Sequence, residues 1–322
     1  TQSRSSAASD VYKRQIQDCL ETNDKPVLAY VSPYAPDTLK RLNSAGIPGF
    51  SSPESCSAVL GALDLIAQPL ANLAAAPRIP LPAMVEQAAG SLDEAAAKAL
   101  FSQAGLRVPQ SRVVASREEA VRAARELEHP VVLKVLDAKL LHKSDIGGVA
   151  LQQTADSIGA RFDKMVTEVA GHIGYRPDRF LVEAMVAGGH ELILGANRDA
   201  LGTTILLGAG GVTAELYKDT ALRMLPEQGG LTLEQAHSMM QQLITWPLLD
   251  GYRGSKRRDT EALAQAIVNF SALVAAFGER LVTAEINPLF VLPEGQGVVA
   301  ADAVLVLEQA GETQASGERR YG

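Results

Sequence analysis

Short aliphatic runs alternate along the chain with amphipathic segments, and this pattern predicts strands and helices in turn. The first group comprises a predicted strand at 26–32, a helix at 35–45, an extended piece at 47–50 and a helix at 53–68. Ser52 followed by Pro53 is typical of a helix start. Strand, helix, strand and helix in this order indicate part of an open α/β sheet, which is too short here for a whole domain.

The larger part of the chain follows a segment with four prolines between residues 69 and 82, whose composition predicts a linker. Ser91 and Glu94 form a capping-box pattern for a helix that reaches Ala104, and Ser116 and Glu119 form another. Further predicted helices cover 155–172, 233–243 and 260–277, and predicted strands cover 131–135, 149–151, 179–186, 191–197, 203–207, 281–286, 289–292 and 298–301. Helices and strands mix without strict alternation, which favours an α+β domain with mostly antiparallel sheets.

These patterns divide the chain into five segments. Residues 1–15 are polar and show no period, and we expect them to be a non-native or disordered lead-in. The partial α/β unit at 16–70 and the linker at 71–83 precede the α+β domain at 84–308, and the polar residues 309–322 form a tail. The lead-in and the incomplete α/β unit both indicate a chain truncated at its N-terminus.

Composition narrows the functional class. Of the 322 residues, 47% are hydrophobic and 21% charged, which is typical of a globular protein, and the net charge is −7. The acidic balance and an aromatic content of 5% argue against nucleic-acid binding. We expect no membrane span, because no apolar run approaches the ~18 residues that one needs. Cys19 and Cys56 lack metal-binding spacing, and without a secretory signal a cytoplasmic location is expected.

A polar loop between two apolar runs, 131–149, has the sequence VVLKVLDAKLLHKSDIGGV. The first run and the loop contain Lys134, His142, Lys143, Gly147 and Gly148. Backbone N–H groups next to glycines, together with ammonium groups, are suited to binding a polyphosphate. From these residues alone, an ordinary exposed hairpin remains the alternative.

Two further glycine-containing segments have polar neighbours. The first, EAMVAGGHE at 183–191, predicts a strand end where backbone amides read an adenine edge and Met185 packs on its face, although a plain hairpin is the simpler interpretation. The second, 208–215, contains Gly210 and Gly211. Arg223 follows it and could meet a phosphate or a carboxylate.

Three oxygen-bearing side chains interrupt apolar strands near the C-terminus. Alternation places Glu285 and Asn287 on the same face of one strand, and Asp302 follows an apolar run on the next strand but one. Three oxygen ligands that converge suit Mg²⁺, which keeps several waters and bridges nucleotide phosphates. Polar caps at strand ends are the alternative.

Five motifs in order, LKVLDAKLLHKSDIGGV, ELILGANRD, GAGGVTAELYKD, GYRG and EINPL followed by ADA, resemble the ATP-grasp domain of the NDP-forming acyl-CoA synthetases, the relatives of succinyl-CoA synthetase. The resemblance covers about 84–307. Residues 26–70, with AGIPGFSSPE, resemble the end of the flavodoxin-like CoA-ligase domain that precedes ATP-grasp in fused members. We therefore expect an ATP-grasp fold preceded by a C-terminal remnant of that α/β domain.

The resemblance implies an acid–thiol ligase of the ADP-forming type, in which ATP phosphorylates a histidine, the phosphoryl group passes to a small carboxylic acid, and CoA displaces it. ATP and Mg²⁺ are the implied cofactors, and CoA is the co-substrate. The family's main phosphohistidine lies in the CoA-ligase part. We therefore expect that part to act as a partner domain or subunit, in a homo- or hetero-oligomer.

The residues and the resemblance together give each candidate a role. The catalytic candidates are His142 as phosphoryl relay, with Lys143 and Arg223. A neutral imidazole is a nucleophile at pH 7, which suits the relay. The nucleotide-binding candidates are Lys134, Gly147, Gly148, Glu183, Met185, Val186, Glu191, Gly210 and Gly211. The Mg²⁺ candidates are Glu285, Asn287 and Asp302.

Two other functions stay open from the sequence. One is a synthetase-like ligand-sensing region of a protein lysine acetyltransferase, and the other is an ATP-grasp ligase of another substrate class. The presence of His142, Lys134, Asn287 and Asp302 favours catalysis over sensing, because a sensor has no need of a relay histidine. The HKSDIGGV loop argues against the second alternative.

Overall fold

The computed structural model describes residues 14–16, 18, 25–67, 89–127, 130–140, 143–211, 219–226 and 229–308. The chain divides into two compact units, Thr1–Leu73 and Ala74–Gly322. The predicted linker at 71–83, the tail at 309–322 and residues 1–13 of the predicted lead-in lie outside the described residues.

Between residues 25 and 67, the smaller unit contains two helices and two short strands. In chain order these are β1 (Ala29–Tyr30), α2 (Pro36–Ser44), β2 (Gly49–Phe50) and α3 (Pro53–Ala67). The two strands are parallel, and α2 connects them. The hydroxyl of Ser52 accepts a hydrogen bond from the backbone N–H of Ser55 at 3.2 Å, as the predicted helix start requires. The predicted strand, helix, strand and helix are therefore all present.

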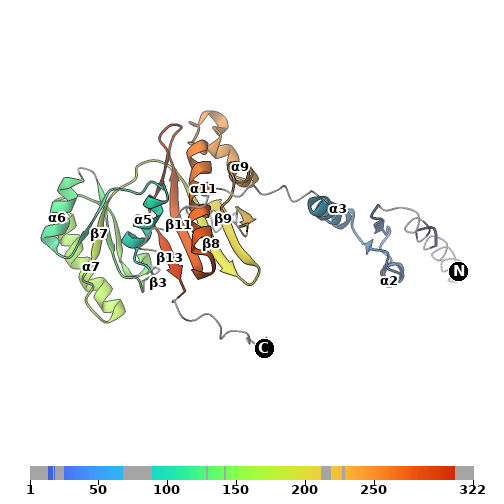
Figure 1. Cartoon of the computed structure of the whole chain (residues 1–322), viewed down its shortest axis with the longest axis horizontal. Helices are drawn as coiled ribbons and strands as arrows, with labels where there is room; N and C mark the ends of the chain where they lie inside the picture. The colour runs from blue at the N-terminus through green and yellow to red at the C-terminus, as the bar shows by residue number, and fades with distance from the viewer. Residues whose placement is uncertain are drawn as a thin grey trace. The chain divides into compact units, whose positions relative to one another are not determined.

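The larger unit contains two antiparallel sheets (Figure 1). In the large sheet the strand order is β10 (Thr220–Met224), β9 (Gly202–Ala209), β8 (His190–Asp199), β11 (Leu281–Val291), β13 (Val304–Leu307) and β3 (Gly90–Ser91), with β12 (Val298–Ala300) also on β11. In the small sheet it is β4 (Ser111–Val114), β7 (Phe180–Ala184), β5 (Val131–Val135) and β6 (Val149–Gln153). The antiparallel pairing confirms the predicted α+β class.

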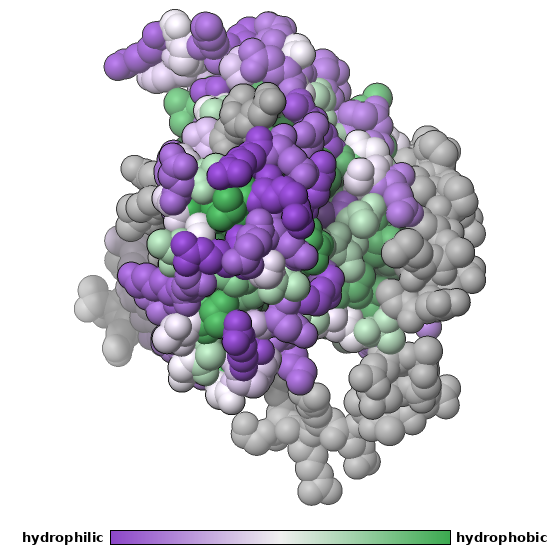
Figure 2. Space-filling view, turned by 90° about the vertical axis from the view of Figure 1, so that its left-hand side faces the viewer, coloured by the Kyte–Doolittle hydropathy of each residue, from purple (hydrophilic) through white to green (hydrophobic). Residues whose placement is uncertain are grey.

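Helices cover one face of each sheet (Figure 1). The small sheet packs on α6 (Arg117–Glu126) and α7 (Ile158–Ile173), whose outward side is largely hydrophilic (Figure 2). The large sheet packs on α5 (Glu94–Gln103), α9 (Leu233–Gln242) and α11 (Thr260–Phe277), and the short α10 (Trp246–Leu249) follows α9. Each sheet therefore buries one face in its own core and leaves the other for the site.

Helix α11 is apolar on most of its surface. Among the described helices it is long and apolar enough, by composition, to cross a membrane. In this fold it packs Ile267, Phe270 and Val274 into the core of the large sheet, and Phe270 meets Phe101 of α5 edge to face. A helix that is hydrophobic all round is expected in the core of a protein of this size, and burial accounts for its composition.

The structure differs from the sequence predictions in one helix cap, in one strand that was predicted as two, and in four further strands. Ser91 lies in β3, and the N-cap of α5 is Asp93, whose carboxylate accepts from the backbone N–H of Ala96 at 2.9 Å. The strands predicted at 281–286 and 289–292 form one strand, β11. The pairing of β11 with β8 shifts register between Ile286 and Leu289, which accommodates Pro288 inside the strand. Strands β3, β4, β10 and β13 were not predicted.

Candidate active site

The candidate site is a cleft between the two sheets, made of two adjoining chambers. The apolar chamber has a volume of about 520 Å³ and the polar chamber about 390 Å³. The two share Ser144, Val149, Asn287 and Asp302 in their walls. The apolar chamber also contains the predicted nucleotide residues Lys134, Glu183, Met185, Val186 and Glu191. Residues predicted from three separate segments, 131–149, 183–191 and 285–302, therefore line the cleft.

Strand alternation delivers these side chains to the cleft. On β5, Val131, Leu133 and Val135 enter the core beneath the small sheet, so Val132 and Lys134 face the apolar chamber. The same alternation on β11 buries Ala284 and Ile286 in the core, so Glu285 and Asn287 face the cleft. Phe290, on the same strand, provides a flat apolar wall of the size that a nucleobase needs.

Lys134 is held at the floor of the apolar chamber by three oxygen atoms. Its Nζ lies 2.6 Å from Oε1 of Glu94, 3.2 Å from Oε1 of Glu183 and 2.8 Å from the carbonyl oxygen of Ala301. Burial alone would lower the pKa of Lys134, but the carboxylates of Glu94 and Glu183 outweigh it and hold that pKa above its ordinary value. Lys134 is therefore a fixed positive charge in the wall of the cavity.

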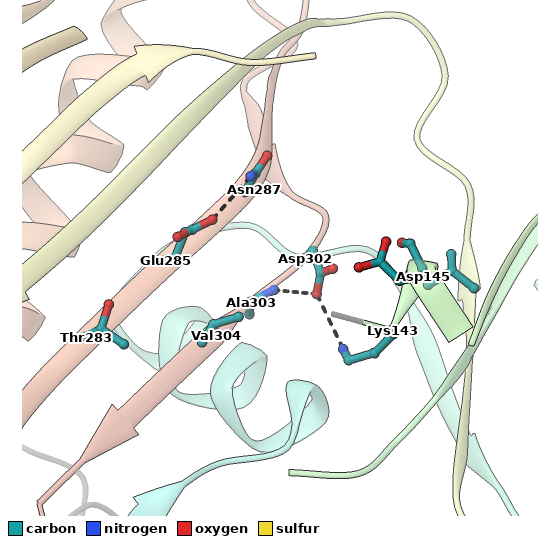
Figure 3. Close-up of a pocket in the computed structure, with 10 residues that line it drawn as sticks. Lys143, Asp145, Thr283, Glu285, Asn287, Asp302, Ala303 and Val304 are labelled. Atoms are coloured by element: carbon teal, nitrogen blue, oxygen red, sulfur yellow. Dashed lines mark hydrogen bonds and ion pairs between the residues drawn. The ribbon is translucent and has the colours of Figure 1, made fainter. Parts of the chain in front are cut away.

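Lys143 brings a second positive charge to the polar chamber. Its ammonium group pairs with Oε2 of Glu94 and lies 3.7 Å from Oδ1 of Asp302 (Figure 3). The residue precedes a short 3₁₀ turn, Ser144–Ile146, that leads into β6. His142, the predicted relay, lies outside the described residues. Its chain neighbour Lys143 lines the polar chamber.

Gly147 and Gly148 shape that turn and do not line either chamber. Gly147 has φ +72° and ends the 3₁₀ turn, while the N–H of Gly148 donates to the carbonyl of Lys143 at 2.8 Å. A Cβ at Gly148 would lie 2.7 Å from Cγ1 of Val135. Close packing of the loop on β5 therefore explains Gly148, and the phosphate-binding role of the two glycines stays a prediction.

The three predicted Mg²⁺ ligands, Glu285, Asn287 and Asp302, all line the polar chamber (Figure 3). Asp145 lines the same chamber. The amide of Asn287 donates to Oε1 of Glu285 at 3.2 Å, and Oδ1 of Asp302 accepts from the backbone N–H of Ala303 at 2.8 Å. Burial raises the pKa of Asp302, so a cation beside this carboxylate would stabilise its charged form. These hard oxygen donors fit Mg²⁺.

The donor set is also open. Among the described residues, no group of three or more His, Cys, Asp and Glu side chains is arranged to hold a metal by itself. Mg²⁺ commonly takes only one or two carboxylates and completes its shell with waters and substrate phosphates, so an open set next to Lys143 matches that habit.

Gly210 and Gly211 lie against the cleft residue Glu191. The N–H of Gly210 donates to the carbonyl of Glu191 at 2.9 Å, and a Cβ at Gly210 would meet that carbonyl carbon at 2.8 Å. Gly211 has φ +72°, and its Cα faces the Glu191 carboxylate. The glycines allow close approach as predicted, but what they approach is β8 and its side chain. Residues 212–218 of this motif lie outside the described residues.

Arg223 takes a different place from the predicted one. On β10 its guanidinium donates to Oε1 of Gln242 and to the hydroxyl of Ser238, each at 2.9 Å, and both acceptors belong to α9. It lines neither chamber. Alternation on this edge strand turns its side chain toward the helix, and the catalytic role of Arg223 stays a prediction that this arrangement does not support.

Two buried charged residues directly behind the lysines of the cleft are absent from the site residues that the sequence predicts. Glu94 and Lys98 lie one turn apart on α5, and both side chains are nearly inaccessible to solvent. The sequence pattern predicts Glu94 only as part of a helix cap. A signal was present, since a glutamate and a lysine four residues apart lie on the buried face of an otherwise alanine-rich, apolar helix.

The chain is similar to a known family, to characterised proteins and to solved structures. A family model described as an ATP-grasp domain matches residues 83–307. The beta subunit of acetate–CoA ligase (ADP-forming) I of Pyrococcus furiosus is 33% identical over 221 residues, which cover 67% of this chain and 91% of that subunit. The trans-feruloyl-CoA synthase FCS1 of an unknown prokaryotic organism is 35% identical over 272 residues, 83% of this chain but 38% of its own length.

A solved structure gives the same result. The dinucleotide-forming acetyl-coenzyme A synthetase 1 of Ca. Korarchaeum cryptofilum, in complex with coenzyme A, Ca-AMPCP and HgCl⁺, superposes with a TM-score of 0.63 at 31% identity. The alignment covers 69% of this chain and 96% of that one. These relatives are CoA ligases, which favours the synthetase prediction over a sensor or another ligase class.

Proposed function

The chain belongs to the ATP-grasp domain family of the ADP-forming acyl-CoA synthetases, and we propose that it performs the ATP-dependent phosphoryl transfer of such an enzyme. The observation that carries the proposal is the cleft, where two lysines and three oxygen donors from distant motifs meet beside an apolar chamber. The overall reaction would convert an acid, CoA and ATP to acyl-CoA, ADP and phosphate.

Each end of the cleft has a role in this proposal. Val132, Phe290 and the Met185–Val186 backbone would hold the adenine, and Glu191 would lie near the ribose. Lys134 and Lys143 would bind and orient the phosphates. Glu285, Asn287 and Asp302 would hold Mg²⁺, which when bound neutralises phosphate charge.

His142 would accept the phosphoryl group, since it directly precedes Lys143 in the loop that enters the polar chamber. Its imidazole nitrogen forms a bond to the γ-phosphorus of ATP as the bond to ADP breaks. The phosphoryl group then passes to the carboxylate of the acid, which regenerates histidine and gives an acyl phosphate. The thiol of CoA attacks that acyl carbon and phosphate leaves.

A partner domain or subunit would provide the binding sites for the carboxylic acid and for CoA. The α/β segment at 16–70, in the smaller unit, is proposed to be part of a flavodoxin-like CoA-ligase domain. The parallel β1–α2–β2 unit and the synthase alignment, which covers more of this chain than residues 83–307, support that assignment.

Labelling with ATP tests the relay. The purified chain is incubated with Mg²⁺ and ATP carrying ³²P in the γ position, and acid-labile, base-stable label is measured in the wild type and in His142→Ala. Label that the variant loses supports the phosphohistidine step. Equal label in both proteins contradicts it, and bound ATP without label in either indicates that the partner domain is required.

A further inference from the structure

Glu94 and Lys98 are charged residues that the proposed function leaves without a role. The side chain of Glu94 is 0% exposed and that of Lys98 is 4% exposed. Neither residue lines the cleft. Burying charges is costly unless each is paired, so a buried pair at this place calls for an explanation through its neighbours.

The carboxylate of Glu94 is divided between the two lysines of the cleft. Oε1 lies 2.6 Å from Nζ of Lys134, and Oε2 pairs with Nζ of Lys143. One rigid group, located in the first turn of α5, therefore determines where both ammonium groups lie. The neighbours of Glu94 hold its pKa well below its ordinary value, so it is an anion throughout the neutral range.

Lys98 completes the cluster from behind. Its Nζ pairs with Oε2 of Glu183, lies 2.8 Å from Oε1 of Glu94, and donates to the carbonyl of Ala301 at 2.8 Å. Lys134 donates to the same carbonyl. The cluster balances three ammonium groups, Lys98, Lys134 and Lys143, against three carboxylates, Glu94, Glu183 and Asp302.

This cluster also connects the two sheets. Lys134 and Glu183 belong to the small sheet, while Ala301 joins β12 to β13 of the large one and α5 packs against β13. Removing the charge of Glu94 would leave Lys134 and Lys143 without their common partner and the cluster with excess positive charge. The ammonium groups would then separate and rearrange, since like charges repel.

We propose that Glu94 is a positioning residue that holds Lys134 and Lys143 at the spacing that the nucleotide phosphates require. Lys98 keeps Glu94 in place, because it pairs with Glu94 and neutralises Glu183. This inference rests on the proposed function, because it takes the two lysines to face the phosphates. It predicts that Glu94 acts on phosphate recognition and not on recognition of the nucleoside.

The test compares ligands that differ only in phosphate number. Affinities of ATP, ADP and adenosine are measured by calorimetry with Mg²⁺, for the full chain and for Glu94→Gln, Glu94→Asp and the exposed control Glu118→Gln. We expect Glu94→Gln to weaken ATP and ADP by roughly tenfold or more, the usual size of a lost charged contact. Adenosine should change by less than about twofold, and Glu94→Asp, which keeps the charge, should recover part of the ATP affinity.

Outcomes separate this inference from the proposed function. A wild-type chain that does not bind ATP contradicts the proposed function. A wild type that binds ATP, with Glu94→Gln equal to it or weakened equally for all three ligands, overturns the positioning role alone. If Glu94→Gln does not fold, Glu94→Asp decides, since it should weaken ATP more than adenosine. A merely structural residue would lower thermal stability without this dependence on phosphate number.

Discussion

Gly148→Ala would show how tightly the loop that carries Lys143 is packed. The added Cβ would lie 2.7 Å from Cγ1 of Val135, 2.8 Å from the carbonyl oxygen of Lys143 and 3.3 Å from its Cβ. Non-bonded carbon atoms prefer about 3.5–4.0 Å, so the first contact overlaps by roughly 1 Å. The carbonyl cannot simply rotate away, because it accepts the Gly148 N–H at 2.8 Å and so closes the turn.

The expected cost follows from overpacking. Forcing an extra methyl group into a well-packed site typically lowers the free energy of unfolding by about 1–3 kcal/mol. Relief would require the turn to move off β5, which displaces Lys143 from Glu94 and the polar chamber. We therefore expect Gly148→Ala to lower both stability and ATP affinity.

Urea unfolding and calorimetric ATP titration measure the two effects. The matched control is Gly171→Ala in the last turn of α7, where an added Cβ meets nothing within 4 Å. That change should stabilise the helix by up to about 1 kcal/mol and leave ATP affinity unchanged. Equal urea midpoints and equal ATP affinities for Gly148→Ala and the wild type would refute this account of the loop.

Three further predictions concern residues around the site. Arg223→Ala should lower the free energy of unfolding by about 1 kcal/mol in urea, because the hydrogen bonds to α9 are lost, and it should leave ATP affinity unchanged. A large loss of ATP affinity would instead support an anion-binding role for Arg223. Asp219→Ala should lower stability by about 1 kcal/mol for each hydrogen bond that is lost, because Asp219 accepts from the N–H groups of Ile244 and Thr245. An unchanged melting temperature would contradict this. The depressed pKa of Glu94 means that its stabilising contribution is present above the ordinary value of 4.5 and is lost as pH falls below it, so acid unfolding should be less steep in Glu94→Gln than in the wild type.

Predictions from the sequence succeeded where local pattern and tertiary structure agree. The helix expected at 260–277 has those limits, and the Ser116 cap accepts from the N–H of Glu119 at 3.2 Å as its spacing requires. Strand alternation also placed Glu285 and Asn287 on one face, and the structure brings them to one chamber with Asp302.

The rest depended on contacts between distant residues. Two-residue strands such as β3 form only because β13 pairs with them, and no local pattern predicts that. Arg223 looked like an anion-binding residue because it follows a glycine cluster, but its register against β9 turns it to α9. Glu94 resembled an ordinary helix-start residue, and its role depends on lysines 40 and 49 positions away.

Titration of the purified chain with ATP and Mg²⁺ tests the central claim most directly. The account predicts saturable binding of one nucleotide for each chain, strongly weakened in Lys143→Met, whose side chain lines the polar chamber. The exposed control Lys256→Met should bind like the wild type. A folded wild-type chain that gives no heat of binding, or a Lys143→Met variant that binds ATP as tightly as the wild type, would contradict the assignment of this cleft.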